Sequence, residues 1–292
     1  MSYDLFFRMP EQVAAPNIES LQSYFKERKN YEVSDKQAFY QNETTGVYFI
    51  FDFEAPEDED LSGVAPISFN LNYFRPHIFG LEAEPELKAL VESFGFLVVD
   101  PQMEGMGEGQ YSTEGFLAGW NQGNEFGYRS FLKEEPSEPV LTLPTSQIEA
   151  CWRWNFAREE LQQQLGEDIF VPRFMFLERQ GRVVRSTLWP DGIPTAVPEA
   201  DILMIPRKTI LPKKFFRHPE DMVIAMWEEV KPILDAFPVK AGAVSYHSLE
   251  YATPPEAVLS FLRALQPTTE QVQALPTDKV LNEELVAKAR TK

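Results

Sequence analysis

The sequence predicts an α+β protein made of two similar lobes, each with the order strand, helix, three strands, helix, strand. Runs that alternate apolar and polar residues, typical of half-buried strands, occur in both halves of the chain, with amphipathic helical runs between them. The same order of elements starts again at residue 139, after a glycine-rich stretch. We interpret the repetition as an internal pseudo-duplication. The alternative is coincidence, because α+β orders are common and the halves share no countable sequence identity.

These patterns divide the chain into four parts. They are an N-terminal α+β lobe over 1–101, a glycine-rich connecting segment over 102–138, a C-terminal α+β lobe over 139–267 and a polar tail over 268–292. A duplication buries an interface and leaves a groove along it, and grooves of this kind are common ligand sites. We therefore expect a groove between the lobes.

The N-terminal half contains five predicted strands and two predicted helices. The strands are expected at 3–8, 37–41, 46–53, 67–74 and 96–100. Asn17 can cap a helix whose apolar residues Leu21 and Phe25 follow helical spacing. A second helix is expected to begin at Pro85 and to end at Gly95.

The C-terminal half repeats this arrangement. Its strands are expected at 139–144, 169–178, 181–189, 201–207 and 242–247. The second and third of these are expected to form a hairpin around Arg179, Gln180 and Gly181. Ser146 and Glu149 form a capping box for a helix that Gly166 ends. A further helix is expected to begin at Pro219, because the apolar residues of 223–237 recur at helical spacing.

The connecting segment contains a predicted helix over 112–132, in which glycine recurs at every fourth position from 115 to 127. A four-residue step keeps these glycines near one face. Each glycine costs a helix interior about 0.5–1 kcal/mol relative to alanine, so the face is expected to pack very closely, most simply against another backbone. The alternative is an irregular loop. At a junction of two lobes, this segment would offer Trp120, Asn121, Asn124, Tyr128 and Arg129 as binding residues, or as ordinary inter-lobe hydrogen-bonding groups.

Composition excludes several classes of protein. With 45 acidic and 27 basic residues, the formal net charge is −18, which argues against general binding to nucleic acids or anionic membranes. Apolar runs stay well short of a membrane span, and the N-terminus lacks the pattern of a signal peptide. A single cysteine excludes an internal disulfide. We therefore expect a cytoplasmic protein.

Common site motifs are missing from the sequence. The three histidines have no second histidine or cysteine at metal-ligand spacing. Neither GxGxxG after a strand, GxxxxGK[ST] nor GxSxG occurs. We expect no metal and no cofactor.

Three weaker candidates for chemistry stand out. Ser245, His247 and Glu250 lie close together near a strand end, where a histidine beside hydroxyl and carboxylate groups can act as a general base, although a hydrogen-bonded structural histidine is the more common case. Cys151 is the only thiol, flanked by apolar residues. A basic group could bind an anion or pair with the protein's own acidic surface; it comprises Arg207, Lys208, Lys213, Lys214 and Arg217.

The function expected from these observations is acidic protein–protein binding. An exposed acidic loop supplies the candidate contact residues Glu54, Glu57, Asp58, Glu59 and Asp60. Acidic and aromatic surfaces give inhibitors both affinity and fast association. We expect a bacterial immunity-type protein that neutralises a basic toxin or nuclease by occluding its active site. The alternatives are an enzyme with a non-standard site in the inter-lobe groove and a subunit of a larger assembly.

Overall fold

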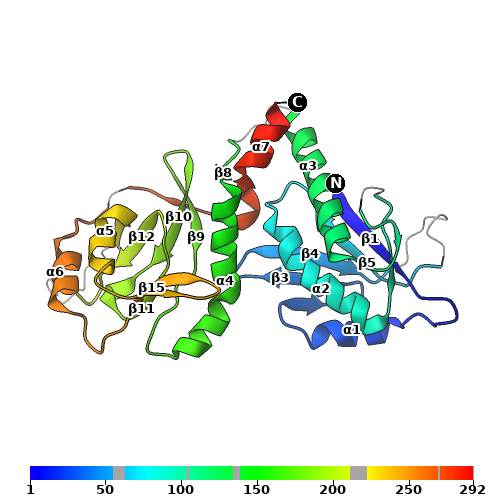
Figure 1. Cartoon of the computed structure of the whole chain (residues 1–292), viewed down its shortest axis with the longest axis horizontal. Helices are drawn as coiled ribbons and strands as arrows, with labels where there is room; N and C mark the ends of the chain where they lie inside the picture. The colour runs from blue at the N-terminus through cyan, green and yellow to red at the C-terminus, as the bar shows by residue number, and fades with distance from the viewer. Residues whose placement is uncertain (55–62, 103–104, 134–138, 211–221, 269, 292) are drawn as a thin grey trace. The chain divides into compact units, whose positions relative to one another are not determined.

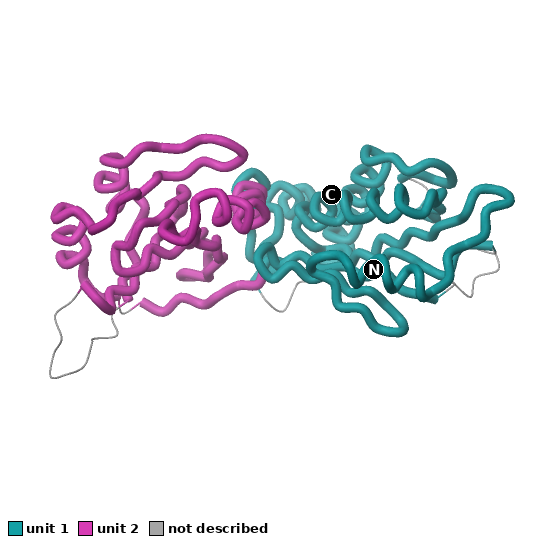
Figure 2. Tube along the Cα trace, turned by 90° about the horizontal axis from the view of Figure 1, so that it is seen from below, with its two compact units in different colours: residues 1–148, 277–292 teal, residues 149–276 magenta. Residues whose placement is uncertain are grey.

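The structure is a computed structural model that describes residues 1–54, 63–102, 105–133, 139–210, 222–268 and 270–291. Within these ranges the fold is α+β, with seven α-helices and four sheets (Figure 1). The chain divides into two compact units, shown in Figure 2. Unit 1 comprises residues 1–148 and 277–292, and unit 2 comprises residues 149–276. Unit 2 is therefore inserted into the chain of unit 1.

Unit 1 is built on an antiparallel sheet of seven strands in the order β2-β3-β4-β5-β1-β6-β7. The strands are β1 (Ser2–Arg8), β2 (Tyr31–Val33), β3 (Gln37–Asn42), β4 (Val47–Asp52), β5 (Ser68–Asn72), β6 (Leu97–Val99) and β7 (Glu108–Gly109). Its helices are α1 (Ile18–Lys26), α2 (Ile78–Phe94) and α3 (Thr113–Lys133). Strand β1 pairs with β5 on one side and with β6 on the other.

One face of this sheet is covered by the three helices. Side chains alternate across each strand, so every second residue points to this face and is buried. Phe25 of α1 packs on Phe51 with ring centroids 4.9 Å apart, and Phe116 of α3 packs on Tyr3 at 5.7 Å. Tyr40 donates a hydrogen bond to a carboxylate on α2. The aromatic core of unit 1 therefore lies between this face and the helices.

The other face of the sheet carries the residues that alternate with the buried ones. Most of these residues are half-buried, and Gln41 and Asn72 are exposed, as is typical of a sheet face on which the described residues form no packed layer. We call it the open face and define it by the following residues: Asp4, Phe6, Phe39, Gln41, Tyr48, Ile50, Asp52, Asn70 and Asn72.

The C-terminal segment of the chain completes unit 1. It contains the 3₁₀ turn η3 (Thr277–Lys279), β17 (Leu281–Asn282) and α7 (Glu283–Arg290). β17 pairs in parallel with β8 (Thr142–Leu143), and α7 packs on α3. Leu281 and Val286 are buried with Tyr128 in one apolar cluster. The segment predicted as a polar tail thus contributes core residues.

Unit 2 contains two sheets. The larger has the order β13-β12-β10-β9-β16 and includes a parallel pair, β10 with β12; the smaller has the order β11-β15-β14. The strands are β9 (Met175–Arg179), β10 (Arg182–Leu188), β11 (Thr195–Val197), β12 (Ile202–Pro206), β13 (Met222–Met226), β14 (Val239–Ala241), β15 (Ser245–Leu249) and β16 (Gln273–Leu275). The helical elements are α5 (Trp227–Leu234), α6 (Glu256–Ala264) and the 3₁₀ turn η2 (Pro190–Gly192), while α4 (Thr145–Leu165) begins in unit 1 and continues into unit 2.

The two units have different topologies. Unit 1 has one seven-stranded antiparallel sheet, whereas unit 2 has a mixed five-stranded sheet and a separate three-stranded one. The described residues therefore give no evidence of two similar lobes, and the coarser prediction of an α+β fold is what the structure shows. The repeated order of elements did not predict the topology, because the order of strands along the chain does not determine which strands pair.

Three local signals for caps and turns are confirmed, whereas the predicted capping box is not, because α4 begins at Thr145 and Ser146 lies inside the helix. Asn17 caps α1 by accepting a hydrogen bond from the Ser20 amide at 2.8 Å. Gly95 ends α2 in the left-handed conformation, with φ of 67°. Gln180 and Gly181, both with positive φ, connect β9 to β10 as the predicted hairpin.

Two predicted helix starts are wrong. α2 begins at Ile78, about two turns before Pro85, which lies inside the helix. The predicted helix from Pro219 is replaced over Met222–Met226 by strand β13, and only Trp227–Leu234 is helical. In β13, Val223 and Ala225 are buried while their neighbours are not, because the strand pairs with β12. Tertiary pairing overrode the helical spacing here.

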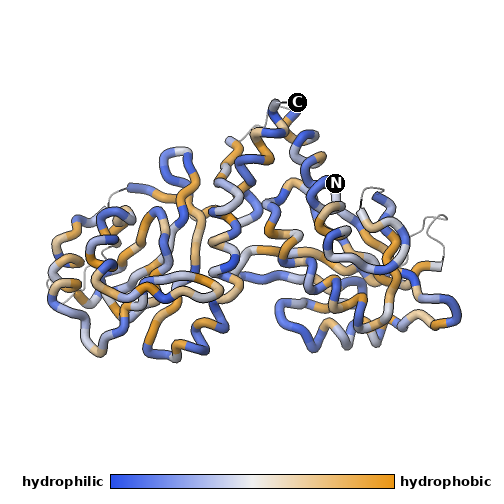
Figure 3. The backbone as a smooth tube through the Cα atoms, in the orientation of Figure 1, coloured by the Kyte–Doolittle hydropathy of each residue, from blue (hydrophilic) through white to orange (hydrophobic). Residues whose placement is uncertain are grey.

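Helices of the described ranges are too short or too polar to cross a membrane. Apolar and polar positions are interspersed along them, as the hydropathy colouring of Figure 3 shows.

Candidate functional site

The open face of unit 1 combines acidic, amide and aromatic side chains. Asp4 accepts hydrogen bonds from Ser2 Oγ at 2.8 Å and Asn70 Nδ2 at 2.5 Å. Phe39 lies opposite Ile50 across the β3–β4 pair, and the next position along the open face of β4 is Asp52. An apolar strip on this face is therefore flanked by two carboxylates.

Acidic groups on this side of the sheet repel one another. Burial raises the pKa of Asp52, and the carboxylates of Glu54 and Asp4 raise it further. Glu54 follows β4, is exposed, and lies 3.8 Å from the exposed ammonium of Lys36. A cation that approached these carboxylates would relieve the repulsion.

Of the acidic loop residues predicted to bind a partner, only Glu54 can be placed. Glu57, Asp58, Glu59 and Asp60 lie outside the described residues. Glu54 is close enough to the open face to act on Asp52, so this predicted residue and the open face belong to one acidic region.

The predicted binding residues of the glycine-rich segment lie on α3, and three of them are buried inside unit 1. Asn124 accepts hydrogen bonds from the Phe74 and Arg75 amides at 2.7 and 3.3 Å and donates to the Arg75 carbonyl at 2.8 Å. The Tyr128 hydroxyl donates to the same carbonyl at 3.1 Å. These side chains fix the loop between β5 and α2. Trp120 is fully buried.

The remaining two residues of that group are nearer the surface. Asn121 is exposed, and Arg129 forms an ion pair with Glu125 at 2.9 Å, one helical turn away. The structure therefore does not assemble the five residues into one surface.

The glycines of α3 accommodate aromatic rings. A Cβ on Gly119 would overlap the Tyr3 hydroxyl, and a Cβ on Gly123 would overlap the Tyr73 hydroxyl. At Gly127 a Cβ would lie 2.8 Å from Tyr73 Cβ. The close packing predicted from the glycine spacing is present, but its partners are mainly tyrosine side chains of the sheet, where another backbone was expected.

The basic group of unit 2 can be placed only in part. Arg207 is 1 % exposed, and its Nη1 donates to the carbonyls of Leu262 and Leu265 at 2.6 and 2.7 Å, at the end of α6. Lys208 is exposed, and Lys213, Lys214 and Arg217 lie outside the described residues. Arg207 thus stabilises a helix end in the way expected of a cation at a helix C-terminus.

The weak catalytic candidates do not form a relay. His247 Nδ1 lies 3.0 Å from the Leu234 carbonyl, and Glu250 accepts a hydrogen bond from Ser248 Oγ at 2.5 Å. Ser245 is exposed at the start of β15. These hydrogen bonds of His247 and Glu250 therefore connect neither residue to Ser245.

Cys151 is buried in α4, and burial raises the pKa of its thiol to about 12. Iodoacetamide is therefore expected to leave Cys151 unmodified in the folded protein at pH 8, because only ~0.01 % of such a thiol is ionised there and the sulfur is inaccessible. Mass spectrometry after timed alkylation, with and without urea, measures this. Rapid labelling of the folded protein would show that the thiol is accessible and reactive.

No group of three or more histidine, cysteine, aspartate or glutamate residues in the described ranges could hold a metal ion.

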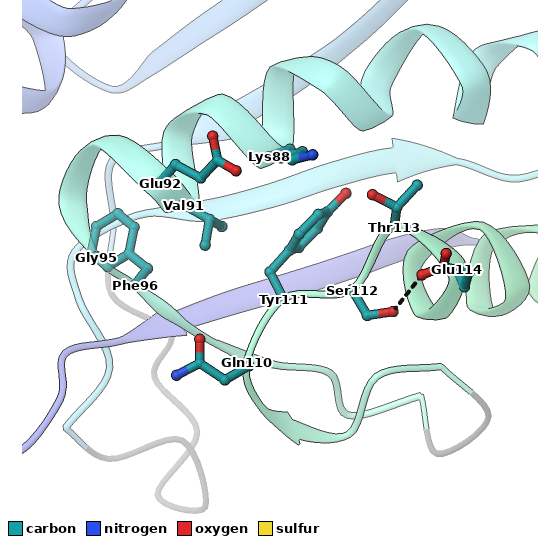
Figure 4. A pocket seen from close by; sticks show the side chains of 10 residues that line it. All are labelled: Lys88, Val91, Glu92, Gly95, Phe96, Gln110, Tyr111, Ser112, Thr113 and Glu114. Carbon is teal, nitrogen blue, oxygen red and sulfur yellow. Dashed lines mark hydrogen bonds between the residues drawn. The ribbon is translucent and has the colours of Figure 1, made fainter.

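A hollow of about 610 Å³ lies between the C-terminal half of α2 and the segment leading into α3 (Figure 4). Tyr111 and Thr113 donate hydrogen bonds to Glu84 at 3.0 and 2.6 Å, and Ser112 donates to Glu114 at 3.2 Å. Lysine and glutamate side chains both line this hollow. The hollow therefore carries charges of both signs, whereas the ionisable groups of the open face at Asp4 and Asp52 are acidic.

The open-face residues on β1, β3 and β5 were missed by sequence reasoning. The signal was present in the alternation of runs such as SYDLFFR and SFNLN, whose second set of residues must point away from the core. Comparisons of the chain with protein-family models, with curated proteins and with solved structures give no significant match.

Proposed function

We propose that this chain is an acidic binding protein that docks a basic protein partner on the open face of unit 1. The observation that carries the proposal is a sheet face on which Asp4 and Asp52 flank the apolar residues Phe39 and Ile50. An inhibitor or immunity-type protein that neutralises a toxin or nuclease by occlusion needs such a surface: apolar residues supply affinity, and charges select the partner.

The charge of the whole chain supports the same partner. A net charge of −18 attracts a cationic protein over a distance of about a Debye length and raises its association rate. The carboxylates of the open face then fix its orientation. Repulsion among Asp4, Asp52 and Glu54 disfavours an anionic partner at this site.

A pair of double variants with equal charge change tests this proposal. Asp4→Asn with Asp52→Asn removes two charges from the open face. The single amide oxygen of an asparagine at position 4 can still accept the bond from Asn70, and its amide nitrogen can donate to the Ser2 hydroxyl. The control is Glu92→Gln with Glu114→Gln, which removes two charges from the helix side of unit 1, where both residues are exposed. With the basic partner captured by the wild-type protein, the open-face variant is expected to associate about three- to tenfold more slowly, and the control within about twofold of wild type.

Association rates by stopped-flow fluorescence, measured at several salt concentrations, check this. Equal reductions of the association rate in both double variants would show that only the net charge of the chain determines the rate. Rates that do not respond to salt would show that electrostatic docking is wrong.

A further inference from the structure

The open face contains a hollow of about 280 Å³, large enough for one side chain. It lies over three neighbouring strands, β3, β4 and β5. Its lining residues are the buried Phe49 and six residues that alternate with the buried ones of these strands: Phe39, Gln41, Tyr48, Ile50, Asn70 and Asn72.

The walls of the hollow are apolar and its rim is built from amides. The rings of Phe39 and Tyr48 lie with centroids 6.3 Å apart, and Ile50 is opposite Phe39 in the register of β3 and β4. The amides come from Gln41 and Asn72, both exposed, and from Asn70. Such a lining can hold a long aliphatic stem while offering carbonyl oxygens to a donor group at its end.

The charge beside the hollow is negative. Asn70 Nδ2 donates to Asp4 Oδ1, which places a carboxylate next to the amide wall. Asp52 occupies the next open-face position after Ile50 on β4. The lining side chains themselves carry no formal charge, so a cation entering the hollow meets amides first and carboxylates behind them.

Arg75 lies beside the hollow and is already held by other groups of the described chain. Arg75 donates from Nε to the Tyr48 hydroxyl at 3.1 Å, and its Nε lies 3.9 Å from Asp278. Its guanidinium lies 5.7 Å from the centre of the Tyr48 ring. A guanidinium at this distance from a ring centre has the geometry of a cation–π contact, and Asp278 offsets the charge of Arg75.

Resting on the function proposed above, we propose that this hollow is the anchor pocket for an arginine side chain of the basic partner. A planar guanidinium stacks on aromatic faces and presents several donors to carbonyl oxygens, whereas an ammonium is compact and more strongly hydrated. Arginine is also among the residues that most often carry the binding energy of an interface. The hollow supplies both an aromatic wall and amide acceptors.

Two lysine substitutions with the same charge change test the pocket. Asn72→Lys places a cation at the rim of the hollow, and Asn121→Lys places one on the exposed surface of α3. Both residues are exposed, so folding is expected to be retained, and the melting temperature of each variant checks this. The probes are a peptide of nine arginines and a peptide of nine lysines, titrated into the full chain by isothermal calorimetry.

The wild-type chain is expected to bind the arginine peptide at least about threefold more tightly than the lysine peptide. Asn72→Lys is expected to lower the affinity for the arginine peptide by about tenfold, and Asn121→Lys is expected to lower it by no more than about twofold. Equal losses from the two substitutions would overturn the pocket, and equal affinities for the two peptides would overturn the assignment to arginine.

The outcomes separate this proposal from the function on which it rests. If Asn72→Lys has no effect on peptide binding while the open-face charge variant still slows association of the partner, docking on the open face is supported and the anchor pocket is wrong. If the wild-type chain binds neither peptide, both the docking of a basic partner and the arginine pocket are contradicted.

Discussion

Replacing Glu82 by alanine is expected to lower the free energy of unfolding by about 3–5 kcal/mol. Glu82 on α2 is fully buried, and its Oε1 accepts hydrogen bonds from Tyr40 Oη at 2.9 Å, Asn42 Nδ2 at 2.8 Å and Thr45 Oγ1 at 2.9 Å. Alanine would leave three donors of the β3–β4 hairpin facing an apolar side chain. Each buried donor without an acceptor costs about 1–3 kcal/mol, and the losses within one network are not fully additive.

Urea denaturation followed by circular dichroism measures the effect of Glu82→Ala. Glu92→Ala is the matched control, since it makes the same change on an exposed position of the same helix and is expected to alter stability by no more than about 0.5 kcal/mol. A loss below about 1 kcal/mol for Glu82→Ala would mean that solvent or other groups satisfy the three donors.

The substitution Gly119→Ala is expected to destabilise the protein by about 2–3 kcal/mol, although alanine is the better helix former by about 1 kcal/mol. A Cβ at this position would overlap the Tyr3 hydroxyl and lie 3.0 Å from the Cα of Gly105. The Tyr3 hydroxyl also donates a 2.6 Å hydrogen bond to Asp100, so displacing the ring breaks a buried polar contact. Neither a backbone atom nor a core tyrosine can move aside at low cost.

The matched substitution for Gly119→Ala is Gly115→Ala, one turn earlier in α3. There a Cβ would meet the Cγ atom of Met106 at 2.6 Å, and the flexible methionine side chain can change its rotamer. Its stability is expected to change by less than about 1 kcal/mol in either direction. Thermal unfolding of both variants tests the pair, and a stabilised Gly119→Ala protein would contradict the packing described for α3.

Local structure was predictable where short-range chemistry decides it. The cap at Asn17, the left-handed Gly95 and the turn at Gln180 and Gly181 depend on residues a few positions apart. The start of α2 at Ile78 was not predictable in this way. Proline is most common at the first position of a helix, whereas Pro85 lies in the interior of α2. The strand over Met222–Met226 depends on pairing with β12, which no local pattern encodes.

The candidate site shows the same limit. The sequence predicted an acidic and aromatic binding surface, and Glu54 adjoins the face on which such groups occur. It did not predict that Asp4 and Asn70 would meet across neighbouring strands, because the order β5-β1 brings together segments more than sixty residues apart. It also assigned Asn124 and Tyr128 to a binding surface, although both hold an internal loop. Polar residues in a glycine-rich helix do not reveal whether they face a ligand or the chain itself.

The insertion of unit 2 into unit 1 has a consequence for synthesis on the ribosome. All residues of unit 2 are translated before Leu281 and Val286, which fill part of the core around Tyr128. Domains generally fold as units while the chain emerges, so unit 2 has its full sequence available first, even though unit 1 starts earlier. Until Glu283–Arg290 has been synthesised, helix α3 lacks its neighbour α7.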